Sequence, residues 1–297
     1  MDISTIHDQD LLKEIGRRFE EKQSSIEEME FLTKKLLDLN EKNQKAQEVK
    51  SQFLSLVKNE FNNPISSLLS IASMLSKAKD LEKVQTMGAL LKQDLLKIDF
   101  SLKNIFAASE IEAGEIANDY NHIHIAEIFE ELLEYFSPII SDKELTVTLD
   151  NQSNKEFVSD SHKIYLILLN LLSNACEFSY IRKEVILRVT CDDKGIYFAV
   201  INFGEGVTQD HAKEIYNRFV HFETGHTRET AGLGLGLSVA RGMAEALDGA
   251  IDNTHIDDAT HFTVFIPYGD ECEIKFAEAV GTNEFMFDTD DDGMVEF

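Results

Sequence analysis

The sequence contains few of the features that define several large classes of protein. Its 297 residues include only three cysteines, widely spaced and odd in number, so neither a disulfide framework nor a metal-binding cluster is indicated. No stretch reaches the roughly 18 consecutive apolar residues that a membrane helix requires. The first residues also lack the basic and apolar regions of a signal peptide. We therefore expect a soluble, cytoplasmic protein with reduced thiols and no membrane partner.

Positive charge is also scarce. The chain has 28 lysines and arginines against 54 aspartates and glutamates, and its net charge at neutral pH is −26. Binding to nucleic acid or to an anionic membrane surface needs a positively charged face. The composition therefore argues against nucleic acid as a general partner.

Proline and glycine are rare in the first third of the chain. Pro64 precedes the next proline by more than seventy residues, and Gly16 and Gly88 are the only glycines between residues 10 and 113. This is helical composition. Apolar residues recur every three or four positions at Leu12, Ile15 and Phe19, and again at Ile26, Met29, Leu32, Leu36 and Leu39, and Lys22 interrupts the stripe between these two groups. The pattern predicts an imperfect coiled coil over residues 1–49, in a parallel homodimer or, alternatively, an amphipathic helix packed within a monomer.

A second helical segment follows over residues 50–118. The stretch 76–80 has the composition of a turn, and a further helix is predicted from Leu81 to Glu112, with Gly114 as its C-cap. Two helices joined by a short loop form an antiparallel hairpin. Two copies of such a hairpin would form a dimeric four-helix bundle.

Residues 119–268 have a different sequence pattern, in which runs typical of β-strands alternate with runs typical of helices. Strands are predicted at 145–149, 184–191, 195–202 and 261–267, and helices at 126–141, 161–179, 209–216 and 235–246. The alternation predicts an α+β domain, with one sheet layered by helices in an α/β sandwich.

The last segment, residues 269–297, is an acidic tail with ten acidic residues and one lysine. It contains a run, 288–296, that matches the first nine positions of a calcium-binding EF-hand loop. The chain ends before the glutamate at position 12 of that loop, which normally gives bidentate coordination. A solvated acidic tail is therefore favoured over a metal site. The interleaved aromatic residues leave open that it docks on a basic groove.

Three polar or glycine-rich segments could carry chemistry. Gly232, Gly234 and Gly236 alternate with leucines directly before a predicted helix, where backbone N–H groups can bind phosphate. Asn170 and Asn174 lie four residues apart on one face of an otherwise apolar helix, and Glu177 follows at the next turn. A strand also runs into a Gly-x-Gly turn over residues 202–206.

Taken in order and spacing, these segments resemble the ATP-binding domain of sensor histidine kinases, which has a Bergerat-type fold shared with gyrase. The N, G1, F and G2 boxes of that family are matched by "LLNLLSNACEFS" (168–179), "NFGEGV" (202–207), "IYNRF" (215–219) and "GLGLGL" (232–237). "FLSLVKNEFNNPISSLL" (53–69) resembles the H box of the family's dimerisation and phosphotransfer hairpin. "NIFAASEIEAGEI" (104–116) resembles the end of that hairpin.

The resemblance assigns a nucleotide and its magnesium to one set of residues, with Asn174 as the metal ligand. That set is Asn170, Asn174, Glu177, Asn202, Gly204, Gly206, Arg218, Gly232, Gly234 and Gly236. Gly232, Gly234 and Gly236 have a structural alternative as helix–sheet packing residues, and Asn174 has one as a satisfied core amide.

The chain departs from the family pattern at three positions. Asn59 stands where the family has its phosphoacceptor histidine, and an amide nitrogen is not a usable nucleophile. Asn202 stands where an aspartate accepts a hydrogen bond from the adenine amino group. Glu177 stands where a lysine usually faces the phosphates. We therefore expect ATP and magnesium to bind weakly or not at all.

The resemblance and its departures together predict a pseudokinase of two-component signal transduction. It would act by docking on a response regulator or a partner histidine kinase. One alternative is a response-regulator phosphatase, because Glu60 and Asn63 match the Glu-x-x-Asn spacing of family members with that activity. A second alternative is a working ATP-dependent kinase with unusual motifs.

Overall fold

The fold comes from a computed structural model, which divides into two compact units, Met1–Asn59 and Glu60–Phe297. The structure describes residues 8–77, 80–114, 116–153, 157–204, 206, 214–218, 233–256 and 258–269. Three features predicted above lie outside these residues: Gly232, the EF-hand-like run and nearly all of the acidic tail. The side chain of Asn59 is also outside the described part.

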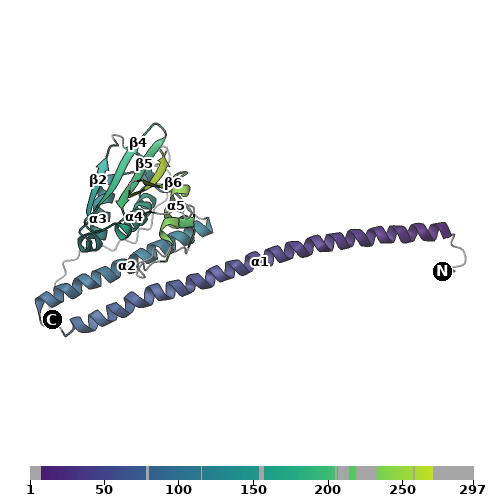
Figure 1. Ribbon diagram of the computed structural model, residues 1–297, viewed down its shortest axis with the longest axis horizontal. Helices are drawn as coiled ribbons and strands as arrows, with labels where there is room; N and C mark the ends of the chain where they lie inside the picture. The colour runs from purple at the N-terminus through teal and green to yellow at the C-terminus, as the bar shows by residue number, and fades with distance from the viewer. Residues whose placement is uncertain are drawn as a thin grey trace. The chain divides into compact units, whose positions relative to one another are not determined.

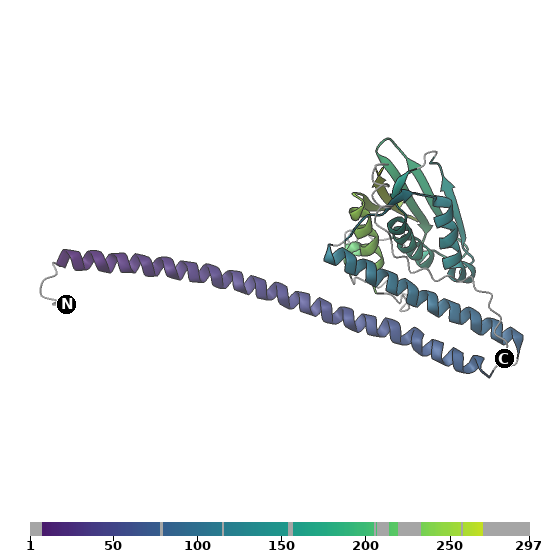
Figure 2. The same cartoon turned by 180° about the vertical axis from the view of Figure 1, so that it is seen from behind.

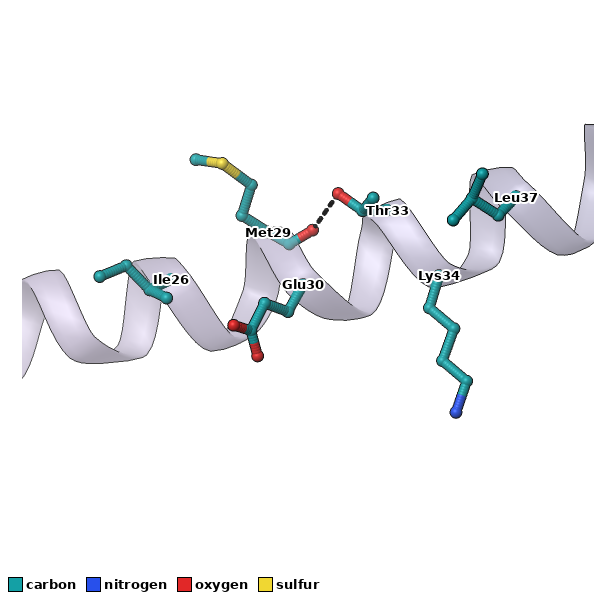
Figure 3. A pocket seen from close by; sticks show the side chains of 6 residues that line it. All are labelled: Ile26, Met29, Glu30, Thr33, Lys34 and Leu37. Carbon is teal, nitrogen blue, oxygen red and sulfur yellow. Dashed lines mark hydrogen bonds between the residues drawn. The ribbon is translucent and has the colours of Figure 1, made fainter.

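The first unit is formed by most of helix α1, Asp8–Leu75. The predicted helix is confirmed, and its apolar side chains are exposed to solvent. In Figure 3, Met29 and Leu37 project from one side of the helix, whereas Glu30 and Lys34 project from the other, around a shallow surface pocket. The large exposed side chains before residue 40 are Leu12, Ile15, Phe19, Ile26, Met29, Phe31, Leu32, Leu36, Leu37 and Leu39.

The helical part of the second unit contains the last turns of α1 and all of α2, Leu81–Ala113. The chain reverses direction between these two helices (Figures 1 and 2). Asp80 caps the start of α2 by accepting a hydrogen bond from the backbone N–H of Glu82, at 3.2 Å. Gly114 ends it in the left-handed conformation, with φ of 67°, which confirms the predicted C-cap.

The rest of the second unit has a five-stranded sheet as its frame. The strands are β2 (Thr146–Asn151), β4 (Glu184–Cys191), β5 (Gly195–Phe203), β6 (Ala250–Ile256) and β7 (Ala259–Pro267), in the order β2-β4-β5-β7-β6. The β2–β4 pair is parallel, and the other three pairs are antiparallel. Two short strands, β1 (Tyr120–His122) and β3 (Val158–Asp160), pair separately. The sequence predicted four of these strands and missed β1, β3 and β6.

Three helices cover one face of the large sheet: α3 (Ile125–Asp142), α4 (Ser161–Phe178) and α5 (Gly236–Ala246) (Figures 1 and 2). The predicted α+β sandwich is therefore confirmed. Helix α4 is almost entirely buried from Lys163 to Leu172 and forms the centre of the core. Of the helix predicted at 209–216, the described residues contain only one turn of 3-10 helix, η2 (Glu214–Tyr216).

Candidate nucleotide-binding site

The buried helix α4 positions the first group of predicted site residues. Asn170 is 2% exposed, and its Nδ2 donates to the backbone oxygen of Leu166 at 2.9 Å. Its Oδ1 is buried without a partner among the described residues. A Cβ added to Gly236 would lie 2.8 Å from that oxygen. The structure thus brings Asn170 against the start of α5, and a larger residue at Gly236 would collide with it.

Asn174 and Glu177 lie farther along α4 and are only half-buried. Partial burial raises the pKa of Glu177, and the nearby ammonium of Lys143 opposes that rise. Lys143 comes from the end of α3, and its Nζ donates to the backbone oxygens of Cys176, Glu177 and Ser179 at the end of α4. The ammonium of Lys143 therefore lies near the carboxylate of Glu177, which stands where the resemblance expects a lysine. Lys143 itself is bound to the backbone oxygens at the C-terminal end of α4.

A row of three polar side chains crosses the sheet next to α4 and α5. Asn202 on β5 is directly opposite Thr260 on β7, and Thr260 is directly opposite His255 on β6. Side chains of directly opposite residues lie on the same face of a sheet. Asn202 is 2% exposed and Thr260 is 4% exposed, and His255 Nδ1 lies 3.0 Å from Thr260 Oγ1. We name Asn202, Thr260 and His255 the β5–β7–β6 row.

The two glycines after β5 are both crowded, but by different neighbours. A Cβ on Gly204 would lie 1.9 Å from the backbone oxygen of Phe178, where Gly204 forms a β-bridge with Ser179. A Cβ on Gly206 would lie 2.2 Å from Nδ1 of His255. The backbone at Gly204 therefore lies against the end of α4, and the backbone at Gly206 lies against His255, the outer member of the row.

The start of α5 follows a glycine in a left-handed conformation and has no side-chain cap. Gly234 has φ of 63°, a left-handed conformation that glycine adopts at little cost. The N-cap residue, Leu235, offers no side-chain cap to the first N–H groups of α5. Unpaired N–H groups at a helix start bind phosphate readily. The role that the resemblance gives to Gly234 and Gly236 in binding phosphate stays a prediction.

Arg218 points toward α2 in the structure. Its Nη1 lies 3.5 Å from Oε2 of Glu112 in a largely exposed ion pair. In the adjoining η2, Tyr216 donates from its hydroxyl to Asn253 Oδ1 at 3.2 Å, and burial raises the pKa of Tyr216. Arg218 therefore has a described partner in the helical hairpin.

The predicted phosphotransfer face lies on α1. Asn59 is within the helix, Glu60 is half-buried, and Asn63 is exposed. Asn63 follows Asn59 by four residues, so the two lie on one face of the helix. The helix continues through Pro64, although proline removes one backbone donor there.

Sequence reasoning missed Lys143, Thr260 and His255. Each belongs to an element that contains none of the motifs identified in the sequence. The packing of α3 on α4 brings Lys143 to the site, and the register of β6 and β7 brings Thr260 and His255 there. The available signal was weak: Thr260 and His255 are polar residues near the ends of adjacent strands.

The residues present suit a purine nucleotide in part. The glycine turns and the open start of α5 would admit phosphates, and Asn174 could serve as an oxygen ligand for magnesium. Two buried amides, Asn170 and Asn202, each retain one polar atom without a partner among the described residues. Glu177, in contrast, places a carboxylate near the expected polyphosphate.

Comparison with known proteins agrees with this description. The family described as "Histidine kinase-, DNA gyrase B-, and HSP90-like ATPase" matches residues 159–270. The curated relatives include the autoinducer 2 sensor kinase/phosphatase LuxQ of Vibrio parahaemolyticus, 26% identical over 76% of this chain, and the circadian input-output histidine kinase CikA of Synechococcus elongatus, 26% identical over 79%. The matches span only 27% and 32% of those relatives' own lengths.

Solved structures show the same fold. The histidine kinase AdeS of Acinetobacter baumannii aligns over 71% of this chain and 98% of its own, with a TM-score of 0.50 and 17% identity. Full-length ShkA in complex with AMPPNP aligns over 74% of this chain and 46% of its own, with a TM-score of 0.53 and 24% identity. Residues 159–270 therefore match the histidine kinase-like ATPase family, and the chain over about three quarters of its length is similar to sensor histidine kinases. Among the described residues, no helix is both long and apolar enough to cross a membrane.

Proposed function

We propose that this chain is a histidine-kinase-like protein of two-component signalling that regulates a partner by docking and does not phosphorylate itself. The observation that carries the proposal is Asn59 at the position of the phosphoacceptor histidine. The amide lone pair is delocalised, and no nearby base can deprotonate the amide near neutral pH. The partner would be a response regulator or a second histidine kinase.

The candidate nucleotide site supports the same proposal. Glu177 places a carboxylate, in place of a lysine, where the resemblance expects the phosphates. Asn202 replaces a charged hydrogen-bond acceptor with a neutral amide, and neutral hydrogen bonds are about half as strong as charged ones. Both changes weaken the binding of ATP and magnesium.

The exposed apolar stripe on α1 supports homodimer formation. Leu36 is 67% exposed and Phe19 is 75% exposed, and a second copy could bury both in a coiled coil. The same symmetry would pair the two hairpins into a four-helix bundle and place two copies of the Asn59–Asn63 face on one assembly.

The first prediction concerns autophosphorylation. After incubation with radiolabelled ATP and magnesium, we expect the full chain to carry no acid-labile label, and the Asn59→Ala variant to behave identically. A catalytically competent histidine kinase in the same buffer provides the positive control. Acid-labile labelling of the wild type that disappears in Asn59→Ala would overturn the proposal. Labelling that persists in Asn59→Ala would point to the alternative of a working kinase with another acceptor.

A phosphatase function is the second candidate, and the exposure of Asn63 favours it. An exposed amide on the docking face could position a water molecule against the aspartyl phosphate of a bound regulator. Glu60 lies one turn earlier at the required spacing. LuxQ, with which this chain shares 26% identity, is itself a sensor kinase/phosphatase.

The second prediction tests this role of Asn63. If the chain is a phosphatase, adding it to a phosphorylated regulator shortens the half-life of the phosphate, and Asn63→Ala slows that step on the order of 100-fold, because the water is no longer positioned. Asn62→Ala is the matched control, since Asn62 is also exposed but faces a different side of α1. Equal half-lives with and without the wild-type chain would remove the phosphatase candidate.

A further inference from the structure

We propose that the ATPase-like domain, residues 119–268, alternates between a state docked on helix α2 and a released state, and that Tyr135 of α3 holds the docked state. The inference goes beyond the proposed function, because it concerns this chain alone and requires neither a nucleotide nor a partner. It rests on a contrast between two sets of contacts. Those that bind the linker after α2 to the domain are buried, whereas the polar contacts along α2 itself are partly exposed.

The linker after α2 is bound firmly to the domain. Lys163 Nζ donates to the backbone oxygen of Ala117 at 2.6 Å, and Asp160 Oδ2 accepts from the backbone N–H of Asp119 at 3.0 Å. The two charged side chains are more than nine-tenths buried and form a salt bridge with each other. Hydrogen bonds between buried charges and the backbone are strong. From Ala117 onward the linker therefore moves with the domain, and any pivot lies between this residue and Gly114, the C-cap of α2.

The polar contacts of the domain with the middle of α2 centre on Tyr135. Its hydroxyl donates to the backbone oxygen of Leu96 at 2.8 Å and also lies 3.1 Å from Oδ2 of Asp99. Lys103 pairs with Asp99, and its Nζ lies 5.3 Å from the ring centroid of Tyr135 and 5.9 Å from that of Tyr165. We name Tyr135, Asp99 and Lys103 the latch. The charged pair of the latch is partly open to water, where ion pairs and cation–π contacts are weak.

The contact farther along α2 contains a feature that favours release. Helix α5 lies against α2 (Figures 1 and 2), and a Cβ added to Gly242 would lie 2.5 Å from Cδ1 of Ile111. Asn104 and Ala107 share this face of α2 and are each 2% exposed. Nδ2 of Asn104 donates to the backbone oxygen of Phe100, but its Oδ1 is buried with no partner among the described residues. A buried acceptor without a donor is unfavourable, and water can reach it once the domain moves away.

The docked state is therefore a balance of small opposing effects. The latch and the close packing at Ile111 stabilise it, and the unpaired oxygen of Asn104 opposes it. The ion pair of Lys92 with Glu134, at 3.7 Å, adds little because both side chains are exposed. An equilibrium balanced in this way shifts measurably with single substitutions. Release uncovers the face of α2 that α5 contacts, and this face belongs to the same hairpin as the predicted phosphotransfer face.

The test is the rate at which a thiol reagent labels the cysteine introduced by Ala107→Cys, resolved by peptide mass spectrometry. Because position 107 is buried in the docked state, labelling requires release. Adding Tyr135→Phe removes the latch hydroxyl and is expected to raise the rate about fivefold. Adding Asn104→Leu removes the unpaired acceptor and should lower the rate by a similar factor. Tyr197→Phe is the matched control, because that hydroxyl donates to Asp192 at 3.0 Å in the β4–β5 hairpin, and the rate should not change.

The native Cys176, which is 1% exposed inside α4, reports whether the domain stays folded, and we expect its labelling to remain slow in every variant. Equal rates at position 107 with and without Tyr135→Phe overturn the role of the latch. Labelling of position 107 only together with Cys176 means that the domain unfolds instead of leaving α2, and overturns the inference as a whole. These outcomes do not depend on whether the chain phosphorylates itself or binds a partner, so the proposed function fails or holds independently.

Discussion

Asp160→Ala is expected to lower the free energy of unfolding of the sheet-containing unit by about 3–5 kcal/mol, which is the usual effect of leaving one member of a buried ion pair alone. Asp160 is 3% exposed and forms a salt bridge with Lys163, which is 6% exposed. Asp160 also caps α4, because its Oδ1 accepts from the backbone N–H of Lys163 at 2.9 Å. One substitution therefore removes a helix cap and isolates a buried ammonium.

The loss should be visible as a lower midpoint of urea denaturation, followed by far-UV circular dichroism. Asp150→Ala is the matched control: Asp150 pairs with Arg188 at 2.7 Å, but both side chains are partly exposed, and we expect little shift of the midpoint. Replacing Lys163 by methionine in the Asp160→Ala background should recover part of the loss, because no buried charge then remains unpaired. Equal shifts for Asp160→Ala and Asp150→Ala would contradict this account.

The fold was predictable from sequence wherever periodicity was strong. Helix α4 and strands β4 and β5 were predicted within a residue or two, because their apolar residues are continuous or alternate strictly. Strand β6 was missed because it is an edge strand whose sequence, "AIDNTHI", is mostly polar and mostly exposed. Strands β1 and β3 have only three residues each, too few to show a period.

The candidate site was predictable only within single elements. Spacing correctly placed Asn170 and Asn174 on α4, but it could not tell that Asn170 is buried against Gly236 while Asn174 is half-buried. The β5–β7–β6 row depends on strand register, which is set by packing between strands distant in sequence. Local patterns carry no such information, so Thr260 and His255 could be found only in the structure.

The structure shows that the two glycines of the Gly-x-Gly turn, Gly204 and Gly206, are crowded by different kinds of neighbour. Gly204 is crowded by the main chain of Phe178, whose carbonyl oxygen cannot rotate away. Gly206 is crowded by the ring of His255, which is a side chain that can move. Gly204 is therefore required by the fold itself, whether or not a nucleotide binds.

Gly204→Ala is accordingly expected to destabilise the sheet-containing unit by about 3 kcal/mol or more, since the new methyl group forces the β-bridge with Ser179 to shift. Gly88→Ala should act in the opposite direction and stabilise by about 0.5–1 kcal/mol, because Gly88 lies inside α2 with open space around it. Gly206→Ala should fall between them and be largely relieved by adding His255→Ala. Urea denaturation of the four variants measures all of these effects. A Gly204→Ala protein as stable as the wild type would show that the turn adapts, and the glycine would then have to be explained by a ligand.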